Sequence, residues 1–257
     1  MYVLETRHAT TDSLPLPHAR IEKPGHPPLL QIYSNQLIPL RKLQRNLSGK
    51  IRKLVLRPST PFQLRIARRL LITSDHRIVQ AKDRQLPRLK IRAGPAFGSG
   101  DHATTHLCLR YLSHFLSAHH QTPTTVLDLG CGSGILTLAA AKLGARAIGW
   151  DNDPTAVSES QRNAKLNRLT HRVHFEVKDA LRAALPSANL IVANLYDSLL
   201  LHLLPRLEKH RRSGSTLILS GILQGQEIQI LRASRKLGWK LQRRGRRGRW
   251  FCLQFFG

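Results

Sequence analysis

The stretch VLDLGCGSGIL, from Val126 to Leu136, joins a run of apolar residues to a cluster of three glycines. The apolar run is typical of a strand buried on both faces of a parallel sheet. The segment ILTLAAAKLG that follows predicts a helix ending at Gly144. Glycines at such a junction let the backbone turn sharply and let a ligand approach the main chain closely. The stretch therefore predicts an α/β fold with a ligand-binding loop, and a tight turn without a ligand is the alternative.

Strand-like and helix-like segments alternate on both sides of this loop. Before it, apolar residues recur at the helical spacing i, i+3, i+4 and i+7, at Cys108, Tyr111, Leu112 and Phe115. After it, helices alternate with further strands, which are predicted at 146–150, 173–179, 188–195 and 215–222. The segments WKLQRR and RWFCLQFF near the C-terminus predict a hairpin. The predicted fold is α/β, a doubly wound Rossmann-like sheet with a C-terminal antiparallel hairpin.

The first part of the chain has a different composition. Prolines at 15, 17, 24, 27 and 28 predict an irregular arm. Short strand-like runs follow at 29–33, 51–58 and 68–74. We expect a basic arm and a small α+β region over residues 1–94, and the doubly wound domain over 95–257.

The charge of the chain is unusual for an enzyme of neutral metabolites. Lys and Arg number 41 against 15 Asp and Glu, which gives a formal net charge of +26 and a pI near 11.5. Such a field attracts polyanions, most obviously nucleic acid or a ribonucleoprotein. Adaptation of a whole proteome to high pI or to an acidic environment explains the charge equally well, and both interpretations stay open.

Other features of the composition exclude several classes of protein. No run of apolar residues approaches the length of a membrane span, and the N-terminal residues lack the apolar core of a secretory signal. The three cysteines, Cys108, Cys131 and Cys252, are widely spaced and form no C-x-x-C pair. We therefore expect a cytoplasmic protein without a membrane partner, a disulfide framework or a metal site.

The glycine loop favours a nucleoside that carries no phosphate groups. Gly130, Gly132 and Gly134 do not match the dinucleotide spacing G-x-G-x-x-G, and no Gly-Lys-Ser/Thr follows them as in a phosphate-binding loop. About twenty residues later Asp151 ends the second strand, where a carboxylate can accept both ribose hydroxyls. With Asp128 before the loop and Asn152 beside Asp151, the pattern predicts an S-adenosylmethionine site.

Two further strands end in polar residues. Asp179 follows the third strand, where an adenine amino group is expected, and Asn194 ends the fourth. Ligands of open α/β sheets lie beyond the carboxyl ends of the strands, so both side chains are candidate ligand contacts. A helix N-cap is the alternative role for each.

Several motifs together resemble one family. They are A-F-G-S-G-D-H-A-T-T at 96–105, D-L-G-C-G-S-G-I-L at 128–136, D-N-D-P-T-A-V at 151–157, V-A-N-L at 192–195 and L-I-L-S-G-I-L-Q-G-Q at 217–226. On these motifs, residues 96 to about 253 resemble the ribosomal protein L11 methyltransferases, a class I family that uses S-adenosylmethionine. The first motif is specific to that family and its near relatives, whereas the glycine motif indicates only the superfamily.

The resemblance implies roles for individual residues. Thr105, Gly130, Asp151 and Asn194 match cofactor-binding positions of the family, and Phe97 and Gly98 line the mouth through which the methyl group passes. With Asn194, these two are the candidate catalytic residues. The implied reaction is methylation of amino groups, on lysine or an N-terminal amine, of a large-subunit ribosomal protein.

The chain departs from the family in ways that bear on the substrate. Asp101 stands where the family has a neutral residue, Tyr196 stands where it has an aliphatic one, and residues 243–250 are unusually basic. Methylation of RNA, with phosphate contacts from 41–57 and 243–249, is therefore an alternative function. A cofactor-binding module without activity is another.

Overall fold

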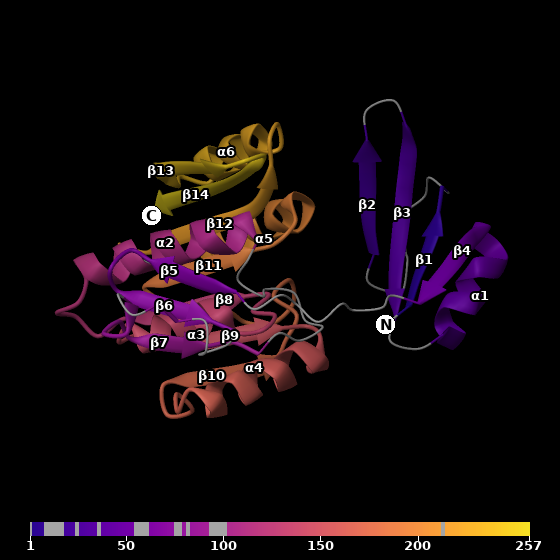
Figure 1. Ribbon diagram of the computed structural model, residues 1–257. Coiled ribbons are helices and arrows are strands. Elements are labelled where there is room, and N and C mark those ends of the chain that lie inside the picture. The colour runs from indigo at the N-terminus through magenta and orange to yellow at the C-terminus, as the bar shows by residue number, and fades with distance from the viewer. Residues whose placement is uncertain are drawn as a thin grey trace. The chain divides into compact units, whose positions relative to one another are not determined.

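The computed structural model describes residues 2–7, 18–23, 26–34, 37–53, 62–74, 79–80, 83–92, 102–211 and 214–257. The chain forms two compact units, Met1–Ser59 and Thr60–Gly257. The sequence predicts a boundary after residue 94, whereas this division falls after Ser59. Figure 1 shows the helices and strands of each unit.

The first unit is a four-stranded sheet with one helix. Its strands pair antiparallel in the order β2-β3-β1-β4. They are β1 (Tyr2–Thr6), β2 (His18–Lys23), β3 (His26–Ser34) and β4 (Gly49–Lys53), and the helix is α1 (Leu37–Leu47). Leu4, Ile32 and Leu40 form its buried core.

The predicted irregular arm is thus largely replaced by strands in the described residues. Pro27 and Pro28 lie in β3, but β1 pairs only with residues 30–34 of that strand. Proline has no backbone N–H to donate, and β1 does not extend to Pro27 or Pro28. No hydrogen bond between β1 and β3 is therefore lost at these two positions.

The second unit is built on a seven-stranded sheet with the order β10-β9-β8-β11-β12-β14-β13. The first five strands of this order pair in parallel, and β14 is antiparallel to both of its neighbours. They are β8 (Thr125–Leu129), β9 (Arg146–Asp151), β10 (Val173–Val177), β11 (Leu190–Asn194), β12 (Thr216–Leu223), β13 (Lys240–Arg247) and β14 (Trp250–Phe256). The predicted doubly wound sheet with a terminal hairpin is confirmed. Because the chain runs from β8 to β9 on one side and reaches β11 on the other, the strand order reverses at β8.

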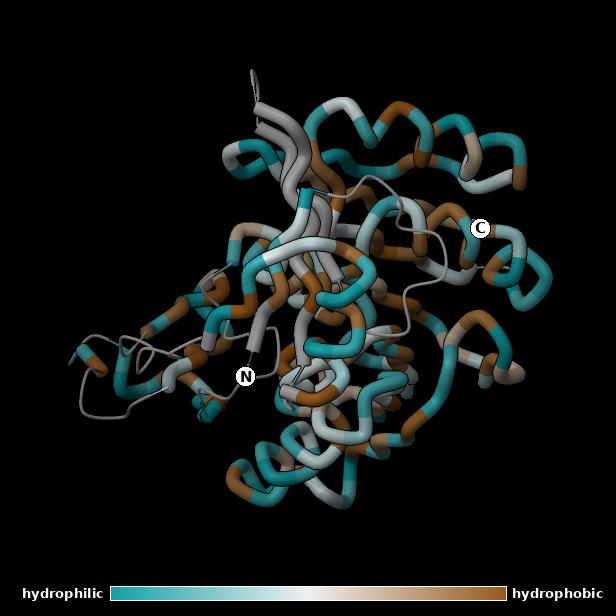
Figure 2. Tube along the Cα trace, turned by 90° about the vertical axis from the view of Figure 1, so that its right-hand side faces the viewer, coloured by the Kyte–Doolittle hydropathy of each residue, from teal (hydrophilic) through white to brown (hydrophobic). Residues whose placement is uncertain are grey.

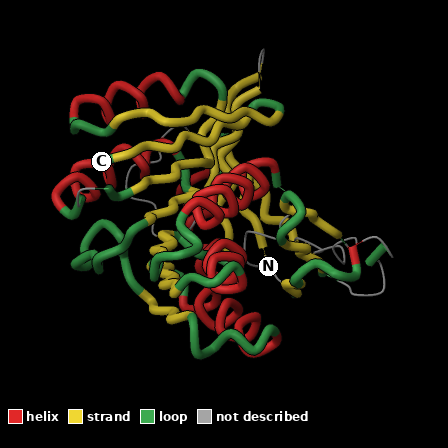
Figure 3. Tube along the Cα trace, turned by 90° about the vertical axis from the view of Figure 1, so that its left-hand side faces the viewer, coloured by secondary structure: helices red, strands yellow, loops and turns green. Residues whose placement is uncertain are grey.

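Helices cover both faces of this sheet (Figure 3). They are α2 (Ala103–Ala118), α3 (Ile135–Lys142), α4 (Pro154–Leu166), α5 (Asp197–Lys209) and α6 (Glu227–Lys236). Val126 and Ile218 belong to the core cluster that contains α2, α3 and α4, whereas their neighbours Leu127 and Leu217 belong to the cluster of α5 and α6. The alternation of side chains along each strand thus supplies two cores. In Figure 2 the helices alternate between hydrophobic and hydrophilic residues along their length.

A small three-stranded sheet also belongs to the second unit. Its strands, in the order β5-β6-β7, are β5 (Gln63–Ile66), β6 (Leu70–Thr73) and β7 (Arg88–Lys90). Ile66 and Ile72 share a buried cluster with α2 and α3. Asn167, which follows α4, accepts from Lys90 N and donates to Lys90 O, each at 2.7 Å. Burial and hydrogen bonding therefore join these strands to the larger sheet.

The predicted helix end at Gly144 is confirmed, and the start of α4 and the end of α6 follow the same local rules. Asp153 caps α4 by accepting a hydrogen bond of 2.8 Å from Thr155 N, and Pro154 takes the first helical position. Gly144 and Gly238, after α3 and α6, have φ angles of 104° and 77°. A side chain is strained in that left-handed region, so glycine ends a helix there. Within the described residues, no helix has both the length and the apolarity that a membrane span needs.

Candidate functional site

The glycine loop runs from the end of β8 to the start of α3. Gly130, Gly132 and Gly134 have φ angles of 74°, 54° and 78°, which L side chains rarely adopt. A Cβ atom on Gly130 would lie 2.4 Å from Leu195 Cδ2, and one on Gly134 would lie 2.7 Å from Ser160 Cβ. The backbone conformation therefore favours glycine at all three positions, and the available space favours it at Gly130 and Gly134.

Asp151 at the end of β9 is tied to this loop. Its Oδ2 accepts a hydrogen bond of 2.9 Å from Gly132 N, and its Oδ1 accepts one of 3.0 Å from Asp153 N. The side chain is thus held in one orientation, yet Asp151 is only partly buried. Each carboxylate oxygen has a second lone pair, so Asp151 retains acceptors for ligand hydroxyls.

Asp128 lies beneath the loop in the core. Its Oδ2 accepts from Thr137 N at 3.1 Å and from Thr137 Oγ1 at 2.6 Å. Burial raises the pKa of Asp128 to about 7, the two bonds from Thr137 oppose that rise, and the charge of Asp151 adds to it. Its bonds to Thr137 hold the first turn of α3. Because Asp128 is 1% exposed, its side chain does not face solvent in this structure.

Besides Asp128 Oδ1, two oxygen atoms near this end of the sheet are buried and unsatisfied in the described part of the chain. Neither Asn194 Oδ1 nor Thr105 Oγ1 has a hydrogen-bond partner among the residues that the structure describes. Asn194 ends β11, next to the β8 loop, and Thr105 lies in the first turn of α2. Leaving a buried polar atom unpaired costs about 1–3 kcal/mol, so both atoms fit contacts to a ligand.

Asp179 and Asn152 are more exposed. Asp179 Oδ1 accepts a 2.8 Å bond from Leu181 N, and Oδ2 lies 3.4 Å from Arg182 Nε. Residues 178–189 form a turn and contain no helix, so Asp179 stabilises the turn after β10 and does not cap a helix as the alternative expected. Asn152 is exposed beside Asp151. Their assignment to a ligand stays a prediction.

The remaining predicted residues fall in the segment before α2. Phe97 and Gly98, with Asp101, lie outside the described residues. His102 caps α2 by accepting from Thr104 N, and its ring lies 4.8 Å from that of Trp250. Among the described residues, no three His, Cys, Asp or Glu side chains gather as they would around a metal ion.

A further glycine, Gly221, shapes the site, although its role was not predicted from the sequence. Gly221 has a φ of 89°, and a Cβ atom there would lie 2.2 Å from the backbone oxygen of Leu195. A register shift in the β12–β14 pairing occurs at this position, between Ser220 and Ile222. Gly221 thus lets the backbone after Asn194 pass close to β12. Its place in an S-G-I-L run within a strand was the available signal, because an isolated glycine in a strand marks a bulge or a close approach.

The strand ends thus combine in one arrangement. The β8 loop and the end of β11 flank the point where the strand order reverses, and ligands of open α/β sheets bind there. The loop offers backbone without side chains, Asp151 offers an anchored carboxylate, and Asn194 offers a free amide oxygen. Together they suit a nucleoside ligand with ribose hydroxyls.

The chain is similar to proteins of one family. A family model described as ribosomal protein L11 methyltransferase (PrmA) matches residues 60–256. The ribosomal protein L11 methyltransferase of Thiobacillus denitrificans is 44% identical over 153 residues, or 59% of this chain and 49% of the relative. That of Thermus thermophilus is 37% identical over 169 residues, or 65% of this chain and 64% of the relative.

A solved structure agrees with these matches. The crystal structure of ribosomal protein L11 methylase from Lactobacillus delbrueckii subsp. bulgaricus aligns with a TM-score of 0.64 at 28% identity, covering 75% of this chain and 97% of that one. The chain spans about half the length of the first curated relatives, 49% and 50%.

Proposed function

This chain belongs to the ribosomal protein L11 methyltransferase family, and from that premise we propose that it transfers methyl groups from S-adenosylmethionine to amino groups of a ribosomal protein. The proposed substrate is protein L11 of the large subunit, and the acceptors are lysine side chains or an N-terminal amine. The proposed activity is that of a protein N-methyltransferase acting in the cytoplasm.

One observation carries the proposal: an anchored carboxylate ends β9 and an unpartnered amide oxygen ends β11, the two strands that flank β8, where the strand order reverses. Asp151 is held by Gly132 N at 2.9 Å and keeps lone pairs for the two ribose hydroxyls of a nucleoside. Asn194 Oδ1 is buried without a partner in the described part of the chain. The loop between β8 and α3 contains no lysine for phosphates, which supports a nucleoside without them.

The chemistry requires positioning more than acid or base groups. S-adenosylmethionine supplies a methyl group that its sulfonium charge already activates. Alignment of the two reactants can supply about 7–11 kcal/mol of the barrier. The acceptor ammonium would lose its proton to water before the attack. Formation of the N–C bond and cleavage of the S–C bond would then leave S-adenosylhomocysteine and a methylated ammonium, which stays charged near neutral pH.

The acceptor amine has to be neutral when it reacts. Deprotonating a lysine of pKa about 10.4 at about pH 7.4 costs roughly 4 kcal/mol. Removing the amine from water lowers that pKa, so the chain needs no dedicated base. In our proposal Asn194 Oδ1 accepts one hydrogen of the neutral amine and directs its lone pair toward the methyl group.

Labelled methyl donor tests the substrate. Free ribosomal protein L11 and protein-free ribosomal RNA are incubated separately with the full chain and S-adenosylmethionine carrying a radioactive methyl group. We expect label in the protein, at amine positions identified by mass spectrometry. Label that enters only the RNA would overturn the substrate, and label in neither, with cofactor bound, would favour a module without activity.

Two substitutions test the roles within the site. Asn194→Ala is expected to lower single-turnover methylation about 100-fold, since misplacing a reactant costs that much, while cofactor affinity changes little. Asp151→Ala is expected to weaken cofactor binding by about 1.5–3 kcal/mol for each charged hydrogen bond lost. A wild-type rate for Asn194→Ala, or unchanged calorimetric affinity for Asp151→Ala, would refute the corresponding role.

A further inference from the structure

A basic pocket lies apart from the site described above, between the second half of α2, strand β13 and the β5–β6 turn. Its volume is about 530 Å³, and five basic residues line it, Arg69, Arg110, His114, Arg243 and Arg244. No carboxylate is among the described residues that line it. Pockets of about 300–1,000 Å³ accept ligands larger than a single oxyanion.

Three of the four arginines have no carboxylate to balance them. Within the described parts of the chain, no ion pair involves Arg69, Arg110 or Arg243. Arg243 Nη2 lies 2.8 Å from His114 Nε2, and among the described residues no other side-chain hydrogen bond from Arg243 is found. Arg110 lies over the ring of Tyr111, 5.8 Å from its centre.

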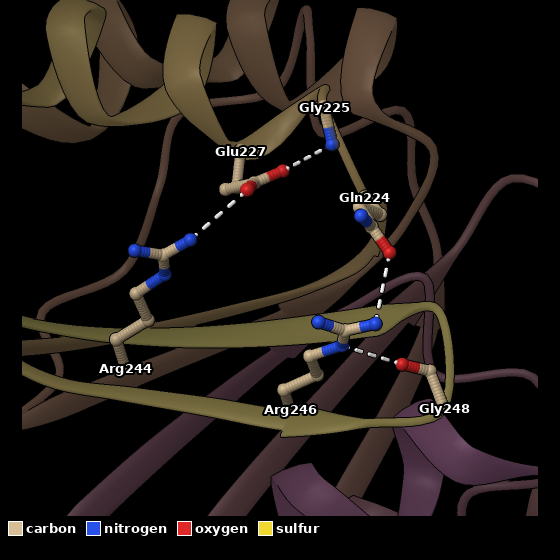
Figure 4. Close-up of polar contacts among 6 residues, drawn as sticks. All are labelled: Gln224, Gly225, Glu227, Arg244, Arg246 and Gly248. Carbon is tan, nitrogen blue, oxygen red and sulfur yellow. Dashed lines mark hydrogen bonds and ion pairs between the residues drawn. The ribbon is translucent and has the colours of Figure 1, made fainter.

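Two other arginines of β13, Arg244 and Arg246, have partners close to the start of α6 (Figure 4). Arg244 forms an ion pair of 3.0 Å with buried Glu227, and Arg246 donates to Gln224 Oε1 at 2.9 Å and to Gly248 O at 2.7 Å. Arg244 thus lines the pocket but is paired with a carboxylate, whereas Arg243 on the same strand lines it without one. Charge that only protected an edge strand would not need this difference.

A glycine on β13 lets one wall of the pocket lie close to α2. Gly245 lies against α2, and a Cβ atom there would come within 2.5 Å of Tyr111 Oη. The glycine thus lets β13 pack closely on α2, which brings Arg243 to His114. Ser113 and Ser117 add hydroxyl groups to the lining.

We propose that this pocket binds the phosphate groups of an RNA strand. Guanidinium groups present planar forks that match phosphate oxygens, and serine hydroxyls donate to the same oxygens. The pocket offers at least three uncompensated positive charges in a chain whose net charge is +26, and phosphate neutralisation by arginine dominates RNA affinity. This inference is independent of methyl transfer, because none of the five basic residues belongs to the proposed cofactor site.

Fluorescence anisotropy with a labelled single-stranded RNA oligonucleotide tests it on the full chain. The pocket variant carries Arg110→Gln and Arg243→Gln. The matched control carries Arg162→Gln and Arg232→Gln, which remove two exposed charges from α4 and α6. We expect the pocket variant to bind RNA at least about tenfold more weakly at low salt, and its log–log salt slope to be shallower by about 1.4, or about 0.7 for each lost contact.

A second pair of variants introduces repulsion without removing arginine. Ser117→Glu puts a carboxylate at the pocket, and Ser158→Glu puts one on the exposed surface of α4. Only the first should weaken RNA binding. Equal losses in pocket and control variants would overturn the proposal in favour of general charge.

Competition distinguishes the chemical source of the anion. Unlabelled RNA should displace the probe, whereas inorganic phosphate at equal phosphate concentration should not. A poly-glutamate peptide that binds as tightly as RNA, and loses as much affinity in the pocket variant, would overturn the proposal in favour of an acidic protein. Displacement by inorganic phosphate alone would overturn it in favour of a small-anion site.

Discussion

The two units of this chain use buried surface very differently. In residues 60–257 both faces of the large sheet are covered, so strands such as β8 and β11 are apolar along nearly their whole length. In residues 1–59 one helix packs on a four-stranded sheet around Leu4, Ile32 and Leu40. The family model begins at residue 60, where the second unit begins. A strand that is buried on both faces of a sheet must keep apolar side chains on both faces. The match to the family therefore covers the unit whose sheet has a core on each face.

The largest effect is expected from Gly221→Ala in the second unit. The left-handed φ of 89° strains alanine by about 1–2 kcal/mol, and its Cβ atom would collide with the backbone of Leu195 at 2.2 Å. We expect unfolding free energy to fall by about 4 kcal/mol or more, with loss of cofactor binding. Denaturant unfolding and calorimetry measure the two effects.

Gly225→Ala is the matched control for that variant. Its φ is 96°, but nothing lies within 4 Å of the added Cβ atom. It carries the strain without the collision, so it should lose only about 1–2 kcal/mol. Equal losses in the two variants would mean that the close approach of Leu195 to β12 contributes nothing.

The next effect concerns a charge inside the double core. The pKa of Asp128 is raised by burial from 3.8 to about 7, so between these values the folded state binds more protons than the unfolded state. Stability attributable to this group therefore falls as pH rises through that window and levels off above about pH 7. The asparagine of the Asp128→Asn variant cannot ionise. The variant should therefore lack the pH-dependent fall of about 2–4 kcal/mol in the free energy of unfolding.

Denaturant unfolding at about pH 5 and about pH 8 measures this prediction. Other groups titrate over the same range in both proteins, so the difference between variant and wild type isolates Asp128. Parallel pH profiles would show that Asp128 in the folded protein is already ionised at about pH 5, against the raised pKa.

A smaller loss is expected from Leu40→Ala in the first unit. Leu40 is fully buried there, but a small core can collapse around the change, so we expect a loss of about 2–3 kcal/mol. All three tryptophans, Trp150, Trp239 and Trp250, lie in the second unit. The loss should therefore appear in circular dichroism, with tryptophan fluorescence and cofactor affinity unchanged. A shift of the fluorescence transition by the same amount would show that the units unfold together.

The smallest effects come from a matched pair, one residue in each unit. Ser48 follows α1 with a φ of 44°, and Arg168 lies just beyond α4 with a φ of 56°. Replacing either with glycine relieves about 1 kcal/mol of left-handed strain. Arg168→Gly should raise the denaturant midpoint of the unfolding transition seen by tryptophan fluorescence. Ser48→Gly should raise the midpoint of the transition that only circular dichroism detects. The opposite pattern would reverse the assignment of the two transitions.

Most of the second unit could be predicted from sequence because local signals and the global fold agree there. The apolar run before Gly130 and the apolar spacing of α2 each predict one element, and the structure has both. The strands of residues 2–23 could not be predicted, since they are short and lie among prolines and charges. Their pairing depends on residues distant in sequence, and no local pattern reports it.

The site was predictable in its residues more than in their partners. A carboxylate after the second strand could be identified from spacing, but its bond to Gly132 N depends on the loop conformation. The role of Gly221 depends on Leu195, which lies on a different strand end. The basic pocket depends on bringing α2 and β13 together across residues far apart in the chain. Contacts of this kind follow from topology and not from any single segment.

The position of β14 between β12 and β13 has a consequence for synthesis. Strand β13 pairs with β14 and not with any earlier strand of the sheet, so it has nowhere to dock when it is first made. Until β14 follows, a nascent strand with four arginines stays unpaired while the preceding parallel strands can already assemble. The last step in building this sheet is therefore a long-range insertion, which is slow because loop closure precedes its stabilising contacts.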